Sequence, residues 1–398
     1  MNDESIYERV DSQELLDIAG DLIRIPSHVE VPGEEREIIY HLEGWLRRQG
    51  FDVQTTQVFP DRKNLMVMLP GRGKGKSLAL NGHLDTVPPG SGMTQPYAPV
   101  IKDGRLYGRG ACDMKGAVAA MLYALLLLRR HNVELAGDLI FTGVIGEETG
   151  GTGTRHLVVK EGFRPDFAVV GEPTDMNIVV SHKGVANLEA IVHGNSYHAS
   201  MPDLGANAIA AACTFVKDVG ERLAPALRKR TQEHVGCATI SVGVIKGGTK
   251  INMVADRCSV LIDRRWVDGE TEEKVSSELE DLLREACARD QRLSCEVRSL
   301  LPLGGYYGPF RIPEEHPLVS AARQVLGMRG LPVSVGGMQG WTDAATLMHA
   351  GVPVILLGPG SVAQAHNDGE YVEVRQLVDA VGVYLSLAET ICGWNKTA

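Results

Sequence analysis

Hydrophobic and polar residues follow two different patterns along this chain. Residues 11–49 carry apolar positions at helical spacing, interrupted by the stretch IPSHVEVPGEE. Four short apolar runs bounded by glycine or proline instead have the pattern of strands buried on both faces. These runs are SLALNG, DLIFTGVIG, DFAVVG and VPVILLGPG. Because helical stretches such as 114–130 lie between them, the alternation predicts an α/β domain with a largely parallel central sheet.

The middle of the chain has a different pattern. Between residues 182 and 295, β-type alternation occurs in GVANLEAIVHG, HVGCATISVGVIKGG and ADRCSVLIDRRW, with helical stretches near 204–222 and 270–289. This β-α-β-β-α-β order predicts a small α+β sandwich. Apolar α/β strand patterns then resume. We therefore expect a smaller domain, 182–295, inserted into a larger one formed by 1–181 and 296–398.

Composition narrows the class of protein. A chain of 398 residues, 44% apolar and 23% charged, is typical of a folded protein of two domains. The net charge of -10 argues against nucleic acid or an anionic membrane as a partner. The most apolar stretch, AVAAMLYALLLL, is shorter than the about 20 residues that span a bilayer, so it predicts a buried helix. The polar start MNDESIYERV and scattered cysteines without a CxxC pair favour a cytoplasmic location.

Histidines and carboxylates gather where the predicted strands end or the helix 114–130 begins. They are His83, Asp85, Asp113, Glu147, Glu148, Glu172 and His366. In an open α/β sheet the carboxyl ends of the parallel strands share one edge, so we expect these side chains to meet there. Carboxylates at such spacing repel unless a cation lies among them. Imidazole and carboxylate donors suit zinc, cobalt or manganese, and their number suits two ions that share one carboxylate. Any single one of them is equally compatible with a cap or a loop residue; the whole set favours a metal site.

Five segments, in this order, resemble the M20 metallopeptidase family. They are GHLDTVP, GRGACDMKGA, GEETGG, GEPT and AHNDGEYV. They span residues 82–372, and the organisation is similar over nearly the whole chain. The inserted domain also fits the resemblance, since in that family it serves as a dimerisation and lid domain. The resemblance therefore implies a homodimer.

The resemblance implies a ligand set for two metal ions. His83, Asp113 and Glu172 would hold one ion. Asp113, Glu148 and His366 would hold the other, so that Asp113 bridges the pair. Zinc is the first expectation, with cobalt or manganese as alternatives.

Further roles follow from the same resemblance. Glu147 would be the general base that takes a proton from the attacking water and passes it to the leaving amine. Asp85 would orient the ring of His83; the alternative is an acid in the turn before the Pro-Pro pair. The peptide bond Asp113–Met114 is expected to be cis. His198 would reach the active site of the partner subunit and stabilise the oxyanion; the alternative is a solvated loop histidine.

Substrate contacts are less specific. Asn252 and Arg265 match family positions, and the guanidinium of Arg265 would bind the substrate carboxylate. Arg264 beside it leaves the choice open, and Ala255 stands where the family usually has proline. The segment GGMQGWTDAATL (336–347) resembles a substrate-pocket segment. The aromatic residues whose place, pocket or packing, stays open are Trp341, Tyr306 and Tyr307.

Together these features predict a dinuclear metallohydrolase that cleaves the amide of an N-acyl amino acid or short peptide. Glutamate at position 172, rather than aspartate, resembles the deacylase and carboxypeptidase members. A dipeptidase or carboxypeptidase of the same family is one alternative. A catalytically silent metal-binding dimer is another, against which the presence of Glu147 argues. The acyl group and the amino acid are left open, because pocket-lining loops are irregular.

Overall fold

The first helices begin and end where the sequence chemistry predicts. In the computed structural model, which describes residues 6–394, α1 (Ser12–Ile23) follows Asp11, whose side chain accepts hydrogen bonds from the backbone of Gln13 and Glu14. The helix α2 (Arg36–Arg48) starts after the predicted break. A short 3-10 turn, η1 (Ile6–Arg9), precedes α1. Residues 1–5 of the polar N-terminal stretch lie outside the described residues.

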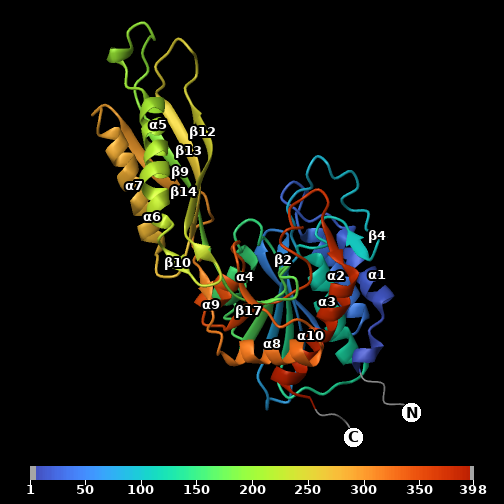
Figure 1. Cartoon of the computed structure of the whole chain (residues 1–398). Helices are drawn as coiled ribbons and strands as arrows, with labels where there is room; N and C mark the ends of the chain where they lie inside the picture. The colour runs from blue at the N-terminus through green and yellow to red at the C-terminus, as the bar shows by residue number, and fades with distance from the viewer. Residues whose placement is uncertain (1–5, 395–398) are drawn as a thin grey trace. The chain divides into compact units, whose positions relative to one another are not determined.

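A nine-stranded mixed sheet organises the larger unit, in the order β1-β2-β6-β3-β7-β17-β8-β15, with β16 paired to β8 (Figure 1). Its central strands β6, β3, β7 and β17 are parallel, and the flanking pairs are antiparallel. Strands β3, β6 and β7 are buried throughout, as their apolar runs predict. The bounds are β1 Val53–Phe59, β2 Arg62–Leu69, β3 Leu78–His83, β6 Leu139–Val144, β7 Phe167–Val170, β8 Ile178–His182, β15 Phe310–Arg311, β16 Val335–Met338 and β17 Val354–Leu356.

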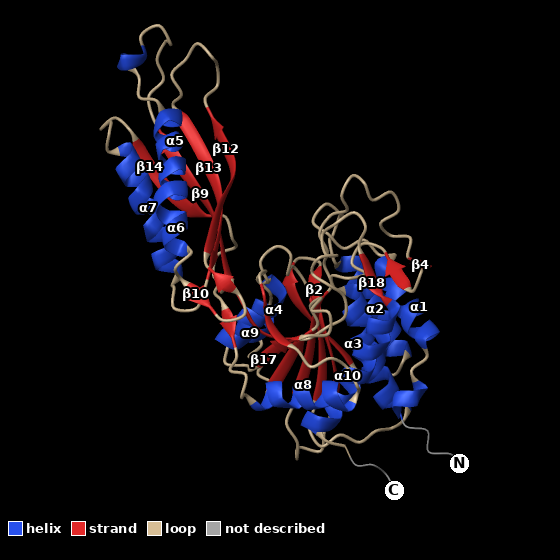
Figure 2. Cartoon of the chain, in the orientation of Figure 1, coloured by secondary structure: helices blue, strands red, loops and turns tan. Residues whose placement is uncertain are grey.

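The apolar stretch 117–128 lies in α3 (Lys115–Arg130), which is buried along nearly its whole length. It packs against β3, against α1 and against α10 (Val374–Cys392) (Figure 2). Glycine at position 82 permits this approach, because a Cβ there would lie 2.8 Å from Val118 Cγ2. The other elements of this unit are α4 Thr152–Lys160, α8 Pro317–Met328, α9 Ala344–His349 and the small sheet of β4 Val100–Lys102, β5 Arg105–Tyr107 and β18 Tyr371–Glu373. Among the described residues, no helix has the length and apolarity needed to cross a bilayer.

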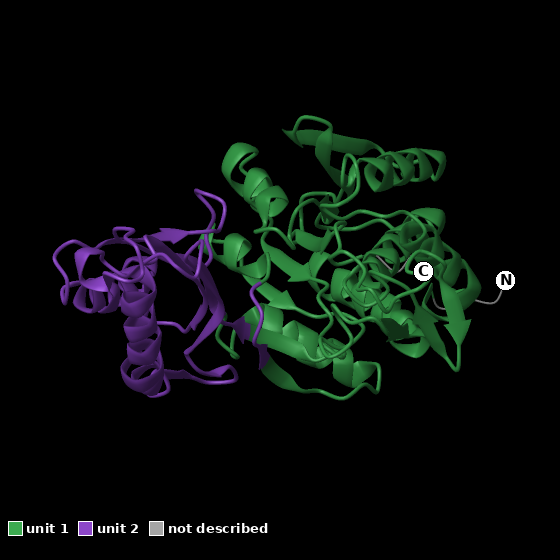
Figure 3. Cartoon of the chain, turned by 90° about the horizontal axis from the view of Figure 1, so that it is seen from above, with its two compact units in different colours: residues 1–180, 312–336, 342–398 green, residues 181–311, 337–341 purple. Residues whose placement is uncertain are grey.

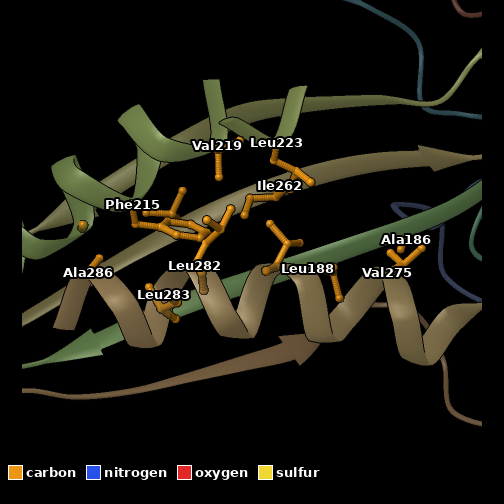
Figure 4. Packing of buried hydrophobic residues seen from close by; sticks show 14 of the residues in the cluster. Ala186, Leu188, Phe215, Val219, Leu223, Ile262, Val275, Leu282, Leu283 and Ala286 are labelled. Atoms are coloured by element: carbon orange, nitrogen blue, oxygen red, sulfur yellow. The ribbon is translucent and has the colours of Figure 1, made fainter. Parts of the chain in front are cut away.

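The smaller unit has the predicted β-α-β-β-α-β order. Its sheet runs β12-β13-β9-β14, and the helices α5 and α7 pack against it. Figure 4 shows the core between them, where Phe215 of α5 meets Leu282 and Leu283 of α7 near Leu188 and Ile262 of the sheet. The bounds are β9 Gly184–His193, α5 Ala208–Asp218, β12 Thr239–Gly247, β13 Arg257–Trp266, α7 Glu272–Cys287 and β14 Ser294–Ser299. Short elements are η2 Pro202–Leu204, the π-helical turn η3 Val219–Leu223, α6 Ala224–Leu227, β10 Thr231–Gln232 and β11 Gly236–Cys237.

Contacts divide the chain near the predicted boundaries (Figure 3). The smaller unit comprises Ser181–Arg311 and Gly337–Trp341, and the rest of the described chain forms the larger one. The first boundary adjoins the predicted one at 182. The second predicted boundary, at residue 295, falls inside β14, which pairs with β9 over Ser294–Ser299. The chain leaves the smaller unit only after this strand has completed its ladder.

Candidate metal centre and active site

Four side chains from distant segments of the larger unit converge at one point. His83 ends β3, Asp113 lies in the loop before α3, Glu148 follows β6, and His366 lies in the loop between β17 and β18. His83 Nε2 is 3.0 Å from Asp113 Oδ1, and His366 Nε2 is 3.3 Å from Asp113 Oδ2. His366 Nε2 is also 3.1 Å from Glu148 Oε1. Each oxygen of Asp113 therefore faces a different histidine, as a carboxylate shared between two ions requires.

Glu172 and Glu147, two further acids that follow predicted strands, lie near these four side chains. Glu172, after β7, is buried, and its Oε1 has no hydrogen-bond partner among the described residues. Burial, with the charge of Asp113, raises the pKa of Glu172 to about 8. Burial, with the charges of Glu172 and Glu148, raises the pKa of Glu147 well above its ordinary value. The larger unit thus brings together buried acids whose negative charges raise one another's pKa.

The histidines show the complementary effect. Burial alone would lower the pKa of His83, but hydrogen bonds with Asp113 and Asp85, together with their charges, raise it well above its ordinary value. Hydrogen bonds with Asp113 and Glu148 raise the pKa of His366 to about 10. Divalent cations would take the place of these protons. Two histidines, a doubly facing carboxylate and an unpartnered buried glutamate fit two such cations.

Asp85 contacts both His83 and the glutamate pair. Its backbone carbonyl, 2.9 Å from His83 Nδ1, is the atom that orients the ring, while its carboxylate Oδ1 lies 3.6 Å from Nδ1. The carboxylate instead accepts hydrogen bonds from the backbone N–H groups of Glu147, at 3.1 Å, and Glu148, at 2.9 Å. One residue therefore fixes both a histidine and the glutamate pair. The peptide bond Asp113–Met114 is cis, as the resemblance led us to expect.

Two buried carboxyl groups near this centre were not singled out from the sequence. Glu370 lies in the segment AHNDGEYV and accepts hydrogen bonds from the loop that carries Asp113. Asp343 lies in GGMQGWTDAATL; its Oδ2 accepts a hydrogen bond of 2.7 Å from Thr154, and its Oδ1 has no partner among the described residues. Both stand inside segments that the sequence analysis quoted. Their burial, which only the fold reveals, is the signal that sets them apart.

The remaining predicted residues lie in the smaller unit. His198 and Asn252 are on two loops joined by a bridge between His198 and Met253, and Ala199 N–H donates to Asn252 O at 3.0 Å. Both side chains are exposed. His198 Nδ1 accepts from the backbone N–H of Ser200 at 3.2 Å, and in a neutral ring with Nδ1 as acceptor, Nε2 is the donor.

Arg264 and Arg265 lie in different surroundings. Arg264 is buried and paired with Glu270, whereas Arg265 is half-buried on the other face of β13. Arg265 is held by Asp263, with Nε–Oδ1 and Nη2–Oδ2 distances of 2.9 Å each. Trp341 packs on Tyr307 with ring centroids 5.6 Å apart. Both residues lie in the smaller unit.

Comparisons with known proteins agree with the geometry. A family model described as peptidase family M20/M25/M40 matches residues 79–390. The N-formyl-4-amino-5-aminomethyl-2-methylpyrimidine deformylase of Bacillus subtilis is 30% identical, over 98% of both chains. The acetylornithine deacetylase of Myxococcus xanthus is 31% identical, over 89% of this chain and 92% of the relative. A tripeptidase structure from Staphylococcus aureus has a TM-score of 0.80 at 24% identity, covering 96% of this chain and 99% of the other; it supports the fold alone.

Proposed function

The chain belongs to peptidase family M20 and is a metal-dependent amide hydrolase, and on that premise we propose that it is a deacylase of small N-acyl amino acids. Two of its relatives, at 30% and 31% identity, are a deformylase and a deacetylase, matched over most of their length. The peptidases are matched by structure at lower identity. Deacylation is therefore favoured over peptide cleavage, which stays the alternative.

A single observation carries the proposal. Asp113 presents one carboxylate oxygen to His83 and the other to His366. We propose that His83, Asp113 and Glu172 hold one divalent cation, and that Asp113, Glu148 and His366 hold the second. Zinc is the first choice for this donor set, and cobalt or manganese would fit the same donors.

The protein's own groups would divide the remaining work. The two cations would supply an activated water and polarise the scissile carbonyl. Glu147 would take the proton of the attacking water and deliver it to the leaving amine. Burial and neighbouring acids raise the pKa of Glu147, which favours uptake of a proton from the attacking water. The carboxylate of Asp85 would keep Glu147 and Glu148 aimed in different directions by holding their backbone N–H groups.

We further propose that the smaller unit serves substrate binding and pairing. His198 Nε2 would donate to the oxyanion in the active site of a partner subunit, and Asn252 would lie beside it. Arg265 would release the carboxylate of Asp263 and bind the carboxylate of the substrate with the same two N–H groups. The edge strand β12 exposes Val244 and Ile245, which supports a homodimer through this unit. Seven unpaired cysteines support the proposed cytoplasmic location.

The test is amine release from a panel of substrates. N-acetyl, N-succinyl and N-formyl compounds are compared with dipeptides and tripeptides after zinc, cobalt or manganese is restored. Glu147→Gln is the matched variant, because it keeps the side-chain shape and removes the base. We expect wild type to hydrolyse N-acyl amino acids fastest, and Glu147→Gln to lose about 10²–10⁴-fold in kcat while it keeps two cations.

The other outcomes separate the alternatives. Faster release from peptides would replace the deacylase by a peptidase of the same family. Two cations bound without turnover of any substrate would favour the silent metal-binding dimer. Absence of bound metal in wild type would overturn the ligand assignment itself.

A further inference from the structure

The loop that carries Asp113 is wrapped around the carboxylate of Glu370. Glu370 Oε1 accepts hydrogen bonds from the backbone N–H groups of Cys112 and Asp113, at 2.9 and 3.1 Å. Oε2 accepts from the N–H of Gly110 at 3.0 Å and from Arg109 Nη1 at 2.6 Å. The side chains of Arg109 and Glu370 are 2% and 0% exposed. Four donors therefore surround one carboxylate that water does not reach.

The sequence GRGACD makes this wrapping possible. Gly110 has a φ of +83°, and a Cβ there would lie 2.9 Å from Lys115 Cδ and from Thr86 Cγ2. Only glycine fits both the conformation and the space. With this turn, the backbone N–H groups of Gly110, Cys112 and Asp113 point to one centre and form an anion-binding concavity. The occupant of the concavity is a side chain of the same protein, Glu370.

The same carboxylate belongs to the segment that follows His366. Arg109 Nη2 donates to the carbonyl of Asn367 at 3.5 Å, and the Gly108 N–H donates to the carbonyl of Glu370 at 3.3 Å. The stretch before Asp113 and the stretch after His366 are thus joined by a buried ion pair and by backbone hydrogen bonds. His366 itself lies on a loop and its side chain is 52% exposed. Its position depends on this junction more than on packing of the ring.

The other histidine is held differently. His83 is the last residue of the buried strand β3, and the Asp85 carbonyl fixes its ring. Neither contact involves Glu370. Disturbing the Glu370 junction would therefore affect His366 much more than His83.

We propose that Glu370, held by Arg109, is a positioning residue that sets the placement of Asp113 relative to His366 and so the affinity for the cation these two share with Glu148. This role rests on the proposed function, since it presumes two cation sites. Removing outer partners of metal ligands lowers metal affinity by about 10–100-fold. We expect the larger loss at the site of His366, and a smaller loss at the site of His83 and Glu172, which shares Asp113.

The experiment is a metal titration of metal-free protein. Zinc binding is followed by calorimetry and cobalt binding by visible absorption, for wild type and for Glu370→Gln. Glutamine has nearly the same shape, but its amide nitrogen is a donor that would face the backbone N–H groups of the concavity. It can accept none of their hydrogen bonds. We expect two cations in wild type. In Glu370→Gln, the second cation binds about 10–100-fold more weakly, and the first, which shares Asp113, loses less affinity than the second.

A matched control lies close by in sequence, on the strand pair β5 and β18. Glu373 of β18 pairs with Arg105 of β5 at 2.8 Å, and both side chains are 40% exposed. Glu373→Gln removes this exposed ion pair and should titrate as wild type. Arg109→Lys keeps the positive charge but loses the fork, and should weaken the second site less than Glu370→Gln does. Thermal unfolding of each metal-free variant establishes that the titrated protein is folded.

The outcomes distinguish the two levels of the proposal. If folded Glu370→Gln binds both cations as tightly as wild type, the positioning role is wrong and the proposed function stands. An equal loss in Glu373→Gln would also overturn it, because any nearby ion pair would then suffice. If Glu370→Gln does not fold, Arg109→Lys takes its place in the test. A folded Arg109→Lys that binds both cations as tightly as wild type would then overturn the positioning role. A wild-type protein that binds no cation would overturn the proposed function together with this role.

Discussion

A buried acid of the smaller unit and two buried acids near the candidate metal centre have opposite surroundings. In the smaller unit, Glu270 is buried and its carboxylate contacts Arg264 and Arg230 while accepting the N–H of Val267 at 2.9 Å. In the larger unit, Glu172 and Asp343 are equally buried. Neither is hydrogen-bonded to an arginine or lysine within residues 6–394. The first arrangement is complete without any ligand, and the second is not.

The difference appears in the pKa values as well. A hydrogen bond from Ser259, with others from Arg298 that outweigh burial, lowers the pKa of Glu189 in the smaller unit. Burial and neighbouring acids raise the pKa of Glu172 and Glu147 in the larger one. A protein that retains uncompensated buried acids lowers its own stability. Such acids are expected where a cation from outside completes the site.

The largest effect that this comparison predicts is on metal-dependent stability. Divalent cations should stabilise the larger unit by about 4 kcal/mol for each site at 1,000 times its Kd, since binding to the folded state alone shifts the unfolding equilibrium. The measurement is thermal unfolding of chelated protein as zinc is restored. Asp113→Asn, which weakens the ligand common to both sites, should lose most of the gain. A melting temperature that does not respond to zinc would contradict the comparison.

Much of the candidate metal centre was predictable because its proposed ligands stand next to elements that the sequence predicts. His83, Glu148 and Glu172 each follow an apolar run that reads as a buried strand, and parallel strands put their ends at one edge. Glu370 was not predictable in this way. Its hydrogen bond to Asp113 joins residues 257 positions apart, and no pattern along the chain encodes that approach.

The second prediction concerns Glu270, the buried acid of the smaller unit that is paired with arginine. Glu270→Gln should lower the free energy of unfolding by about 3–5 kcal/mol, because it leaves the guanidinium of Arg264 buried with its charge unbalanced. Urea unfolding monitored by circular dichroism provides the measurement. Glu285→Gln is the control, since Glu285 pairs with Arg222 at 2.6 Å on the surface and should change stability by about 0–1 kcal/mol. Equal effects of the two variants would mean that burial does not distinguish these pairs.

Some contacts of the smaller unit could have been read from the sequence. Asp263 and Arg265 alternate along one strand, so their side chains share a face, and an ion pair between them follows from period two alone. The same rule puts Arg264 on the opposite face. Its partner Glu270 lies beyond the end of β13, where the chain turns, and only the tertiary structure reveals that contact. The domain boundary shows the same limit, because the ladder of β14 continues past residue 295, where the boundary was predicted.

The smallest expected effect is a pH dependence of stability that arises from Asp343, near the candidate metal centre. Burial raises the pKa of Asp343 to about 7, whereas an unfolded aspartate has a pKa of about 3.9. The folded protein therefore holds this proton more tightly than the unfolded chain does. The stability that it contributes is complete below about pH 4 and is lost as the pH rises through about 7. Asp343→Asn is neutral at every pH and keeps an oxygen to accept the Thr154 hydroxyl, so it should not lose that stability. Between pH 5 and pH 7, chelated wild type should lose about 2 kcal/mol relative to the variant. Urea unfolding across this range measures the difference, and parallel curves for the two proteins would show that Asp343 ionises in the fold as freely as in water.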